Sequence, residues 1–390
     1  MPIIERIAEF QDDLSAWRRD IHAHPETAFE EHRTAEIVAR ALAAMGIEVH
    51  SGLAGTGVVG TVHGNRPDNG RAIGLRADLD ALNVEEKNTF DHRSVHAGKM
   101  HACGHDGHTT MLLGAARYLA ETRDFAGTVH LIFQPAEEGQ AGGRVMIEDG
   151  LFERFPVEAV FGMHNLPGLP LGAFGVNPGA MLAAMDNFDL VVKGRGAHAG
   201  MPHLGIDPVV VAAQIIMGLQ TIPSRMIDPL QPAVISVTWV EAGAAYNVIP
   251  DEAILRGTVR TLSHAVRATM EGRIRALADG IASAAGAAIE LRYENGYPPT
   301  INTPAEAEIA AGIAAKVVGE ANVQRDFAPL MASEDFAFML QEKPGAYVFI
   351  GNGPGEGGCA LHNPHYDFND QLLPIGGSYW ATLVETVLES

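Results

Sequence analysis

The chain has 390 residues, a formal net charge of −21 at pH 7 and a hydrophobic fraction of 47%. This length favours two domains over one core, and the acidic balance argues against nucleic acid or an anionic membrane as a partner. The two cysteines, Cys103 and Cys359, are too few for a disulfide framework, and no run of about 18 apolar residues suggests a membrane span. We therefore expect a cytoplasmic protein.

The first 185 residues alternate between helices and apolar strands. The predicted helices cover 1–20 and 105–122, and the predicted strands cover 71–82, 127–139 and 159–167. The first strand ends near Asp78, Pro135 breaks the second, and the third ends at His164. Strands that alternate with helices are typical of a mainly parallel sheet with helices on both faces.

A different pattern follows. Strands are predicted over 186–194, 232–243, 252–263 and 287–296, and helices over 207–222 and 263–286. Asp207 before Pro208, and Ser263, are typical helix-start residues. The order β-α-β-β-α-β is that of a ferredoxin-like α+β unit. We predict that this domain, 186–296, interrupts a discontinuous α/β domain formed by 1–185 and 297–390, which resumes with a helix over 302–320 and a strand over 346–353.

Unusual side chains follow four predicted strands. They are Asp78, the pair Glu137 and Glu138, His164 and His362. In open α/β sheets, ligands bind beyond the carboxyl ends of the strands. The stretch "MHACGHDGHTT" adds four groups at the start of the helix over 105–122: His101, Cys103, His105 and His108. A thiolate, imidazoles and carboxylates at one edge suit a borderline-soft divalent metal.

Each group alone also has a structural interpretation. A strand-end histidine is commonly hydrogen-bonded, two acids after a proline commonly form a solvated turn, and Asp106 can cap a helix. A buried cysteine is usually a small hydrophobe. The run from 101 to 108 matches no zinc-ribbon spacing, so the metal hypothesis depends on agreement among the strand ends. The residues themselves do not decide whether Glu137 or Glu138 binds metal.

Nine segments together resemble one known family. In chain order they are "RRDIHAHPETAFEEHRTAEIV", "LRADLDAL", "GKMHACGHDGHTTMLLGAA", "FQPAEEG", "GMHNLP", "GRGAHAGMPH", "NVIPDEAILRGTVR", "SEDFAFM" and "LHNPHYDFND". Over residues 17–370 the chain resembles the hippurate hydrolase and N-acyl-amino-acid amidohydrolase family, which includes the plant auxin-conjugate hydrolases. The resemblance implies a two-metal, aminoacylase-type metallopeptidase domain and a satellite domain that mediates dimerisation.

The resemblance also implies roles for individual residues in the metal site. It implies two divalent ions, manganese first, with zinc, cobalt or nickel as the other choices. Glu137 would be the general acid/base, and Asp78 would orient a ligand from outside the coordination sphere. The implied metal ligands are Cys103, His105, Glu138, His164 and His362.

Other implied roles concern the substrate. His198 and Asn247, on the inserted domain, would contact it, and Arg260 would bind its carboxylate. The resemblance leaves open whether His198 acts in its own subunit or in a partner of a homodimer or homotetramer. His22 and His24 match a family signature without a known role, and we expect them to be structural.

The implied reaction is cleavage of an N-acyl amino acid, with an acetyl, benzoyl or arylacetyl group, to a carboxylate and a free amino acid by metal-activated water. A dipeptidase or an N-carbamoyl-amino-acid amidohydrolase is the alternative. A cysteine amidase with Cys103 as nucleophile would leave Glu137 and Glu138 without a role, and a non-catalytic metal protein would leave Glu137 unexplained. We expect the inserted domain to close over the substrate about hinges at 184–186 and 296–300.

Overall fold

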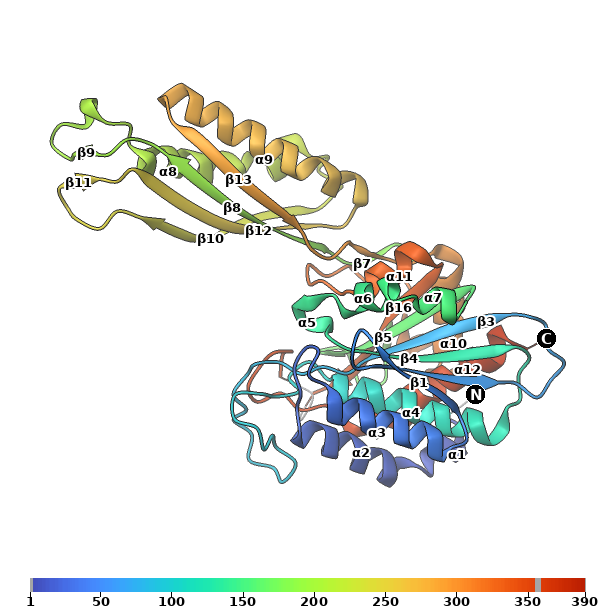
Figure 1. The fold of residues 1–390 in the computed structure, drawn as a ribbon. Coiled ribbons are helices and arrows are strands. Elements are labelled where there is room, and N and C mark those ends of the chain that lie inside the picture. The colour runs from blue at the N-terminus through green and yellow to red at the C-terminus, as the bar shows by residue number, and fades with distance from the viewer. Residues whose placement is uncertain (1–2, 355–358, 390) are drawn as a thin grey trace. The chain divides into compact units, whose positions relative to one another are not determined.

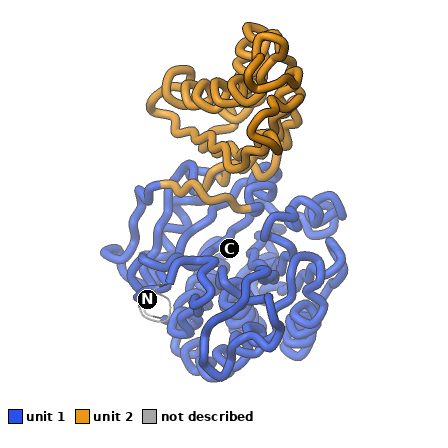
Figure 2. The backbone as a smooth tube through the Cα atoms, turned by 90° about the vertical axis from the view of Figure 1, so that its left-hand side faces the viewer, with its two compact units in different colours: residues 1–181, 301–328, 335–390 blue, residues 182–300, 329–334 orange. Residues whose placement is uncertain are grey.

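The computed structural model describes residues 3–354 and 359–389, which form two compact units (Figure 2). Unit 1 comprises Met1–Met181, Ile301–Ala328 and Asp335–Ser390, and unit 2 comprises Leu182–Thr300 and Pro329–Glu334. The predicted insertion, 186–296, lies wholly within unit 2. Residues 329–334 also belong to unit 2. The chain therefore crosses between the units four times, whereas an insertion alone requires two crossings.

Unit 1 is built on an eight-stranded sheet (Figure 1). Its strands, in spatial order, are β1 (Glu48–Leu53), β2 (Gly57–His63), β4 (Thr128–Gln134), β3 (Ala72–Asp78), β5 (Ala159–Pro167), β16 (Gly345–Gly353), β6 (Phe174–Gly175) and β15 (Val323–Gln324). The four central strands β4, β3, β5 and β16 run parallel, which confirms the predicted fold class. β1 and β2, for which we predicted no strands, extend the sheet in antiparallel fashion.

Helices cover both faces of this sheet. Figure 1 shows α2, α3 and α4 on one face and α6, α7 and α11 on the other. The helices of unit 1 are α1 (Glu5–Ala8), α2 (Gln11–Ala23), α3 (His32–Ala44), α4 (His105–Thr122), α5 (Glu137–Gln140), α6 (Gly142–Glu148), α7 (Leu151–Arg154), α10 (Pro304–Val318), α11 (Phe336–Glu342) and α12 (Leu373–Val387).

The single helix predicted over 1–20 is wrong, because the chain forms α1 and α2 with a turn between them. Phe10, at φ −82° and ψ −1°, makes that turn. Ile7, Phe10 and Leu14 are all buried in the core of unit 1.

The central strands and α4 are buried because apolar side chains meet from both sides. Leu75 of β3 and Leu131 of β4 are fully buried, and α12 and α2 pack against α4. α4 is therefore buried along most of its length, including its first residue, His105. The core thus fixes the point at which α4 begins, beside the carboxyl ends of β3 and β5.

Unit 2 has the predicted ferredoxin-like order. Its antiparallel sheet runs β10 (Ala233–Ala242), β12 (Glu252–Thr261), β8 (Ala184–Lys193) and β13 (Ala288–Asn295), with helices α8 (Pro208–Leu219) and α9 (His264–Ala285). The predicted helix starts are confirmed. The Asp207 carboxylate accepts from the Val209 N–H (2.9 Å), and the Ser263 hydroxyl accepts from the Val266 N–H (3.5 Å).

The two expected hinge segments are bonded to each other inside unit 2. Asp186 is buried, and its carboxylate accepts from Arg267 (2.6 Å), Tyr293 (2.9 Å) and the Gly296 N–H (3.1 Å). Charge-assisted bonds of this kind hold both segments firmly. The nearby crossings between the units lie at 181–182, before the first expected hinge segment, and at 300–301, where the second one ends.

The segment Pro208–Met226 is long and apolar enough to cross a membrane by length and composition alone. A core helix passes the same test, and α8 buries Val211, Ile215 and Leu219 in the core of unit 2. The absence of a membrane partner therefore stays a prediction.

Candidate metal centre

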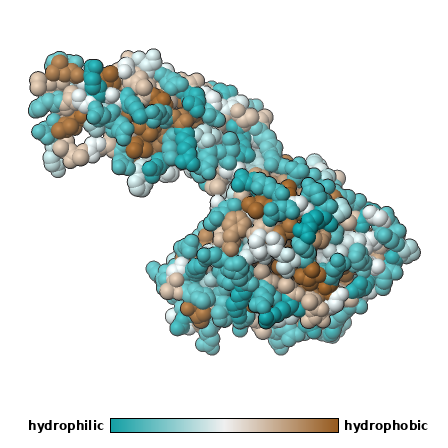
Figure 3. All heavy atoms as spheres, viewed as in Figure 1, coloured by the Kyte–Doolittle hydropathy of each residue, from teal (hydrophilic) through white to brown (hydrophobic). Residues whose placement is uncertain are grey.

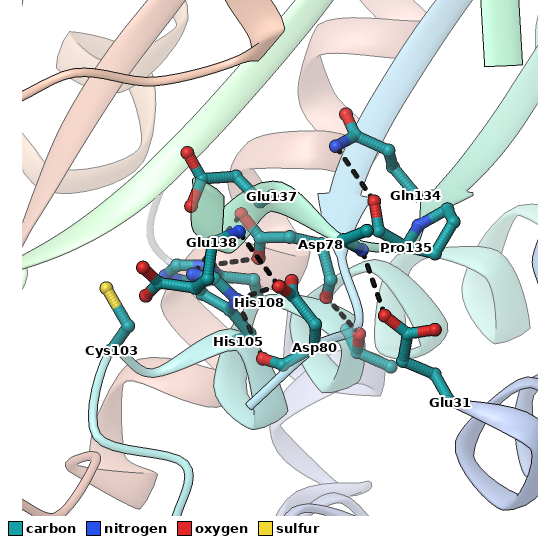
Figure 4. A network of polar contacts seen from close by, with 12 residues as sticks. Glu31, Asp78, Asp80, Cys103, His105, His108, Gln134, Pro135, Glu137 and Glu138 are labelled. Atoms are coloured by element: carbon teal, nitrogen blue, oxygen red, sulfur yellow. Dashed lines mark hydrogen bonds and ion pairs between the residues drawn. The ribbon is translucent and has the colours of Figure 1, made fainter. Parts of the chain in front are cut away.

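Potential metal ligands from four separate segments meet in unit 1. Figure 4 shows those of two segments, Cys103 with His105 and Glu137 with Glu138. Three overlapping groups have ligand atoms that lie within 4.8 Å of one another. They are Cys103 with His105 and His164, Cys103 with Glu138 and His362, and His105 with Glu137 and Glu138. Because the groups share members, the five predicted ligands and Glu137 form one cluster.

A tight turn brings Cys103 and His105 to the same place. Gly104 lies between them with φ +95°, a left-handed conformation that favours glycine. A Cβ at Gly104 would also lie 2.2 Å from Oδ1 of Asn165. The loop that carries His362 is fixed to the same turn, since the His362 N–H donates to the carbonyl of Ala102 (2.8 Å).

Backbone carbonyls set the orientation of two imidazoles. Nδ1 of His105 donates to the carbonyl of Asp80 (2.9 Å), and Nδ1 of His164 donates to the carbonyl of Asn165 (2.7 Å). Since a carbonyl only accepts, Nδ1 of each ring carries a proton, and Nε2 offers its lone pair once it is deprotonated, as metal binding requires. Nε2 of His164 lies 3.3 Å from Sγ of Cys103, and Nε2 of His105 is buried with no hydrogen-bond partner among the described residues. Metal-binding histidines are typically held in this way.

The two glutamates follow β4 on one short turn. Glu137 is buried, and its Oε1 accepts from the Asp335 N–H (3.3 Å). The Glu138 N–H donates to Oδ2 of Asp80 (2.9 Å), and Oε1 of Glu138 lies 3.2 Å from Nε2 of His362. Glu138 thus faces His362, whose side chain is 53% exposed.

Negative charge dominates the buried part of this cluster. Burial, together with Glu138, Glu137 and Asp78, raises the pKa of the Cys103 thiol well above its usual value. Burial alone would lower the pKa of His105, but the charge of Asp78 and the contact with Asp80 outweigh it and raise that pKa to about 10. The cluster therefore attracts positive charge, and its S, N and O donors suit a divalent metal. A nucleophilic cysteine needs the opposite, an electropositive site.

Asp78, for which we predicted the role of an orienting carboxylate, adjoins the cluster. Its Oδ1 accepts from Nδ1 of His108 (2.6 Å), and its Oδ2 accepts from Nη1 of Arg76 (2.7 Å) and lies 3.7 Å from Nε2 of His105. Arg76 is itself buried and donates to Asp335 (3.0 Å) and to Gln134 (2.9 Å). A buried ionic network therefore supports the ends of β3 and β4.

Sequence reasoning missed several of these supporting residues. Asp80 holds both His105 and the Glu138 backbone. Its spacing of two from Asp78 in "LRADLDAL" could have indicated a second carboxylate at the end of the same strand. Asp335 lies in "SEDFAFM", a segment that the resemblance covers but to which we assigned no role. Nothing local in the sequence distinguishes Arg76 or Asn165.

The three predicted substrate-binding residues lie in unit 2 and do not form one group. His198 pairs with Val248 between the short strands β9 (Ala197–His198) and β11 (Val248–Ile249), and Asn247 adjoins them. His198 and Asn247 line a hollow of about 450 Å³. Arg260 lies far along β12 from the end near this hollow, about 25 Å away by the rise of a strand. Nη1 of Arg260 is buried and has no hydrogen-bond partner in the described part of the chain.

Comparisons with known proteins agree with this geometry. The model of peptidase family M20/M25/M40 matches residues 74–386. A hippurate hydrolase of Campylobacter jejuni is 42% identical, and an N-acetylcysteine deacetylase of Bacillus subtilis is 40% identical, each over 98% of both chains. The solved structure of the Bacillus subtilis YXEP protein, described as a dinuclear metal binding peptidase of the M20 family, has a TM-score of 0.86 at 37% identity. The match covers 98% of this chain and 99% of the YXEP chain.

Proposed function

The chain belongs to peptidase family M20/M25/M40, and from this premise we propose that it is a metal-dependent amidohydrolase that cleaves N-acyl amino acids to a carboxylate and a free amino acid. It is a hydrolase of amide C–N bonds. One observation carries the proposal. Nε2 of His105 and of His164, Sγ of Cys103 and the Glu138 carboxylate face one another, with Glu137 beside them. The activities named for the two relatives support the substrate class.

The metal ligands of the proposal are Cys103, His105, Glu138, His164 and His362. Two divalent ions held there would lower the pKa of a water and stabilise the negative charge that develops on the carbonyl oxygen. Support for two ions comes from the overlapping ligand groups and from the dinuclear site named for the YXEP protein. Manganese is our first choice, followed by zinc, cobalt and nickel.

Glu137 moves the proton in the proposed mechanism. Its carboxylate takes a proton from the attacking water and gives it to the departing nitrogen, because an amine leaves poorly unless it is protonated. The Asp335 N–H steadies one carboxylate oxygen of Glu137. Asp80 holds His105 from behind through Nδ1, and Oδ2 of Asp78 lies 3.7 Å from Nε2 of His105.

Unit 2 would supply the substrate contacts and the oligomer contacts. His198 and Asn247, and by resemblance Arg260, are the proposed substrate-binding residues. Figure 3 shows apolar side chains at the surface of unit 2. Trp239 (52% exposed) and Val240 (60% exposed) lie on β10, which is an edge strand, and this supports a homo-oligomer. The proposal includes a cytoplasmic location.

A substrate panel tests the reaction and names the acyl group. Purified protein is given manganese and N-acetyl, N-benzoyl and indoleacetyl amino acids, N-carbamoyl amino acids and dipeptides, and the released amino acid is measured. We expect kcat/KM for the best N-acyl substrate to exceed that for the dipeptides and the N-carbamoyl amino acids by tenfold or more, since the acyl pocket gives the discrimination. Faster cleavage of dipeptides or N-carbamoyl compounds would replace our substrate class with the alternative.

A further inference from the structure

The segment "HAHPETAFEE", residues 22–31, contacts the supports of the metal centre at three points. His22 bonds to Asp106, which follows His105 (2.8 Å). The carbonyl of Glu26 accepts from the N–H of Ala81, which follows Asp80 (2.8 Å). Glu31 accepts from the N–H of Ala136, which precedes Glu137 (2.9 Å).

The contact at Ala136 involves unusual backbone. Ala136 has φ +55° and ψ +42°, a left-handed conformation that a non-glycine residue adopts only when its surroundings impose it. This conformation reverses the chain directly after Pro135 and thereby sends Glu137 and Glu138 toward the cluster. Figure 4 shows Glu31 beside Pro135, on the opposite side of the turn from Cys103.

Glu31 has the geometry to impose that conformation. Its side chain is fully buried, and Oε1 accepts from the N–H of Phe29 (3.0 Å) as well as from that of Ala136. Oε2 bonds to the Thr56 hydroxyl (2.7 Å). All of these contacts lie within unit 1.

We infer that Glu31 is a positioning residue, which fixes the Ala136 turn and so places the Glu137 carboxylate for proton transfer. This inference rests on the proposed role of Glu137. Burial raises the pKa of Glu31 to about 7, yet Oε1 accepts both backbone N–H groups whether or not Oε2 carries a proton. Glu31 therefore acts through its hydrogen bonds and not through its charge. A glutamine, with its N–H₂ group toward Thr56, can make the same bonds to the two backbone N–H groups.

The test compares Glu31→Ala, Glu31→Gln and a matched control, Glu26→Ala. The Glu26 carboxylate lies in the same segment and also accepts from three donors, but these are the N–H groups of Arg33 and Thr34 and the Thr34 hydroxyl. We expect Glu31→Ala to lower kcat about 10- to 100-fold with little change in KM, because small misplacements of a catalytic group cost this much. Glu31→Gln and Glu26→Ala should stay within about threefold of the parent.

Amide hydrogen exchange gives a readout that does not depend on activity. The Ala136 N–H should lose its protection in Glu31→Ala and keep it in Glu31→Gln and Glu26→Ala. If Glu31→Ala does not fold, Glu31→Asp replaces it, because one methylene less withdraws the acceptor from Ala136 by about 1.5 Å while the charge remains.

Two results would overturn the inference. One is a Glu31→Ala enzyme as active as Glu26→Ala, and the other is a Glu31→Gln enzyme as impaired as Glu31→Ala, which would indicate a role of charge. A Glu137→Gln enzyme measured alongside separates the proposed acid/base role of Glu137 from the positioning role of Glu31. If Glu137→Gln is fully active, the proposed mechanism fails whatever Glu31 does. If it is inactive while Glu31→Ala is normal, only the role of Glu31 fails.

Discussion

Glu137→Gln is expected to lower kcat for amide hydrolysis by about 10²- to 10⁴-fold, the usual contribution of a general acid/base. Glutamine keeps the shape of the side chain and an oxygen that accepts from the Asp335 N–H, but it cannot take a proton from water. Since Glu137 is not among the five proposed ligands, the variant should bind as much metal as the parent. Steady-state kinetics and metal analysis of the same preparation measure both effects.

The neighbouring glutamate supplies the control for this prediction. Glu138→Ala removes a proposed ligand and should lose metal and activity together, because Glu138 lies at the point where Cys103 and His362 approach each other. Near-normal turnover by Glu137→Gln would contradict the assignment of the acid/base. Metal loss from Glu137→Gln that equals the loss from Glu138→Ala would contradict the division of roles between the two.

Arg76→Met should lower the free energy of unfolding by about 3–5 kcal/mol, the usual effect of breaking a buried ion pair from one side. Arg76, Asp78 and Asp335 all have fully buried side chains, so the substitution removes the guanidinium that both carboxylates contact in the core of unit 1. Denaturant unfolding in the presence of a chelator measures this effect without a contribution from bound metal.

Arg40→Met is the matched control for Arg76→Met. Arg40 pairs with Glu36 on the surface of α3, and its side chain is 76% exposed. Exposed pairs contribute little, so Arg40→Met should change the stability by less than about 1 kcal/mol. Equal stability of the two variants would mean that the Arg76 network does not support the centre as we describe.

The central strands β3, β4, β5 and β16 could be predicted from the sequence because their causes are local, whereas β1 and β2 were not predicted. Apolar runs end at a polar or cyclic residue, as at Asp78 and Pro135. Because the carboxyl ends of parallel strands meet at one edge of the sheet, the side chains that follow them are expected to lie together there. In unit 2, Asp207 and Ser263 mark helix starts through bonds to the backbone two or three residues later. Such signals need no knowledge of the rest of the fold.

The supports of the site could not be predicted, because their partners are distant in sequence. Arg76 lies in an apolar strand and finds Asp335 259 positions later, and Glu31 reaches Ala136 across 105 positions. The left-handed conformation of Ala136 also contradicts its local preference, so only the folded core reveals it. Arg260 was chosen by resemblance, and the strand register places it far from the hollow at His198.

Removal and return of metal is the measurement that tests the central claim most directly, namely that the Cys103–His105–Glu138–His164–His362 cluster is a hydrolytic metal centre. The protein is chelated, freed of chelator and assayed on its best N-acyl amino acid before and after titration with manganese. Our account predicts no hydrolysis after chelation and full recovery at about two ions per chain, since the ions supply the activated water. Hydrolysis that survives complete removal of metal would contradict it.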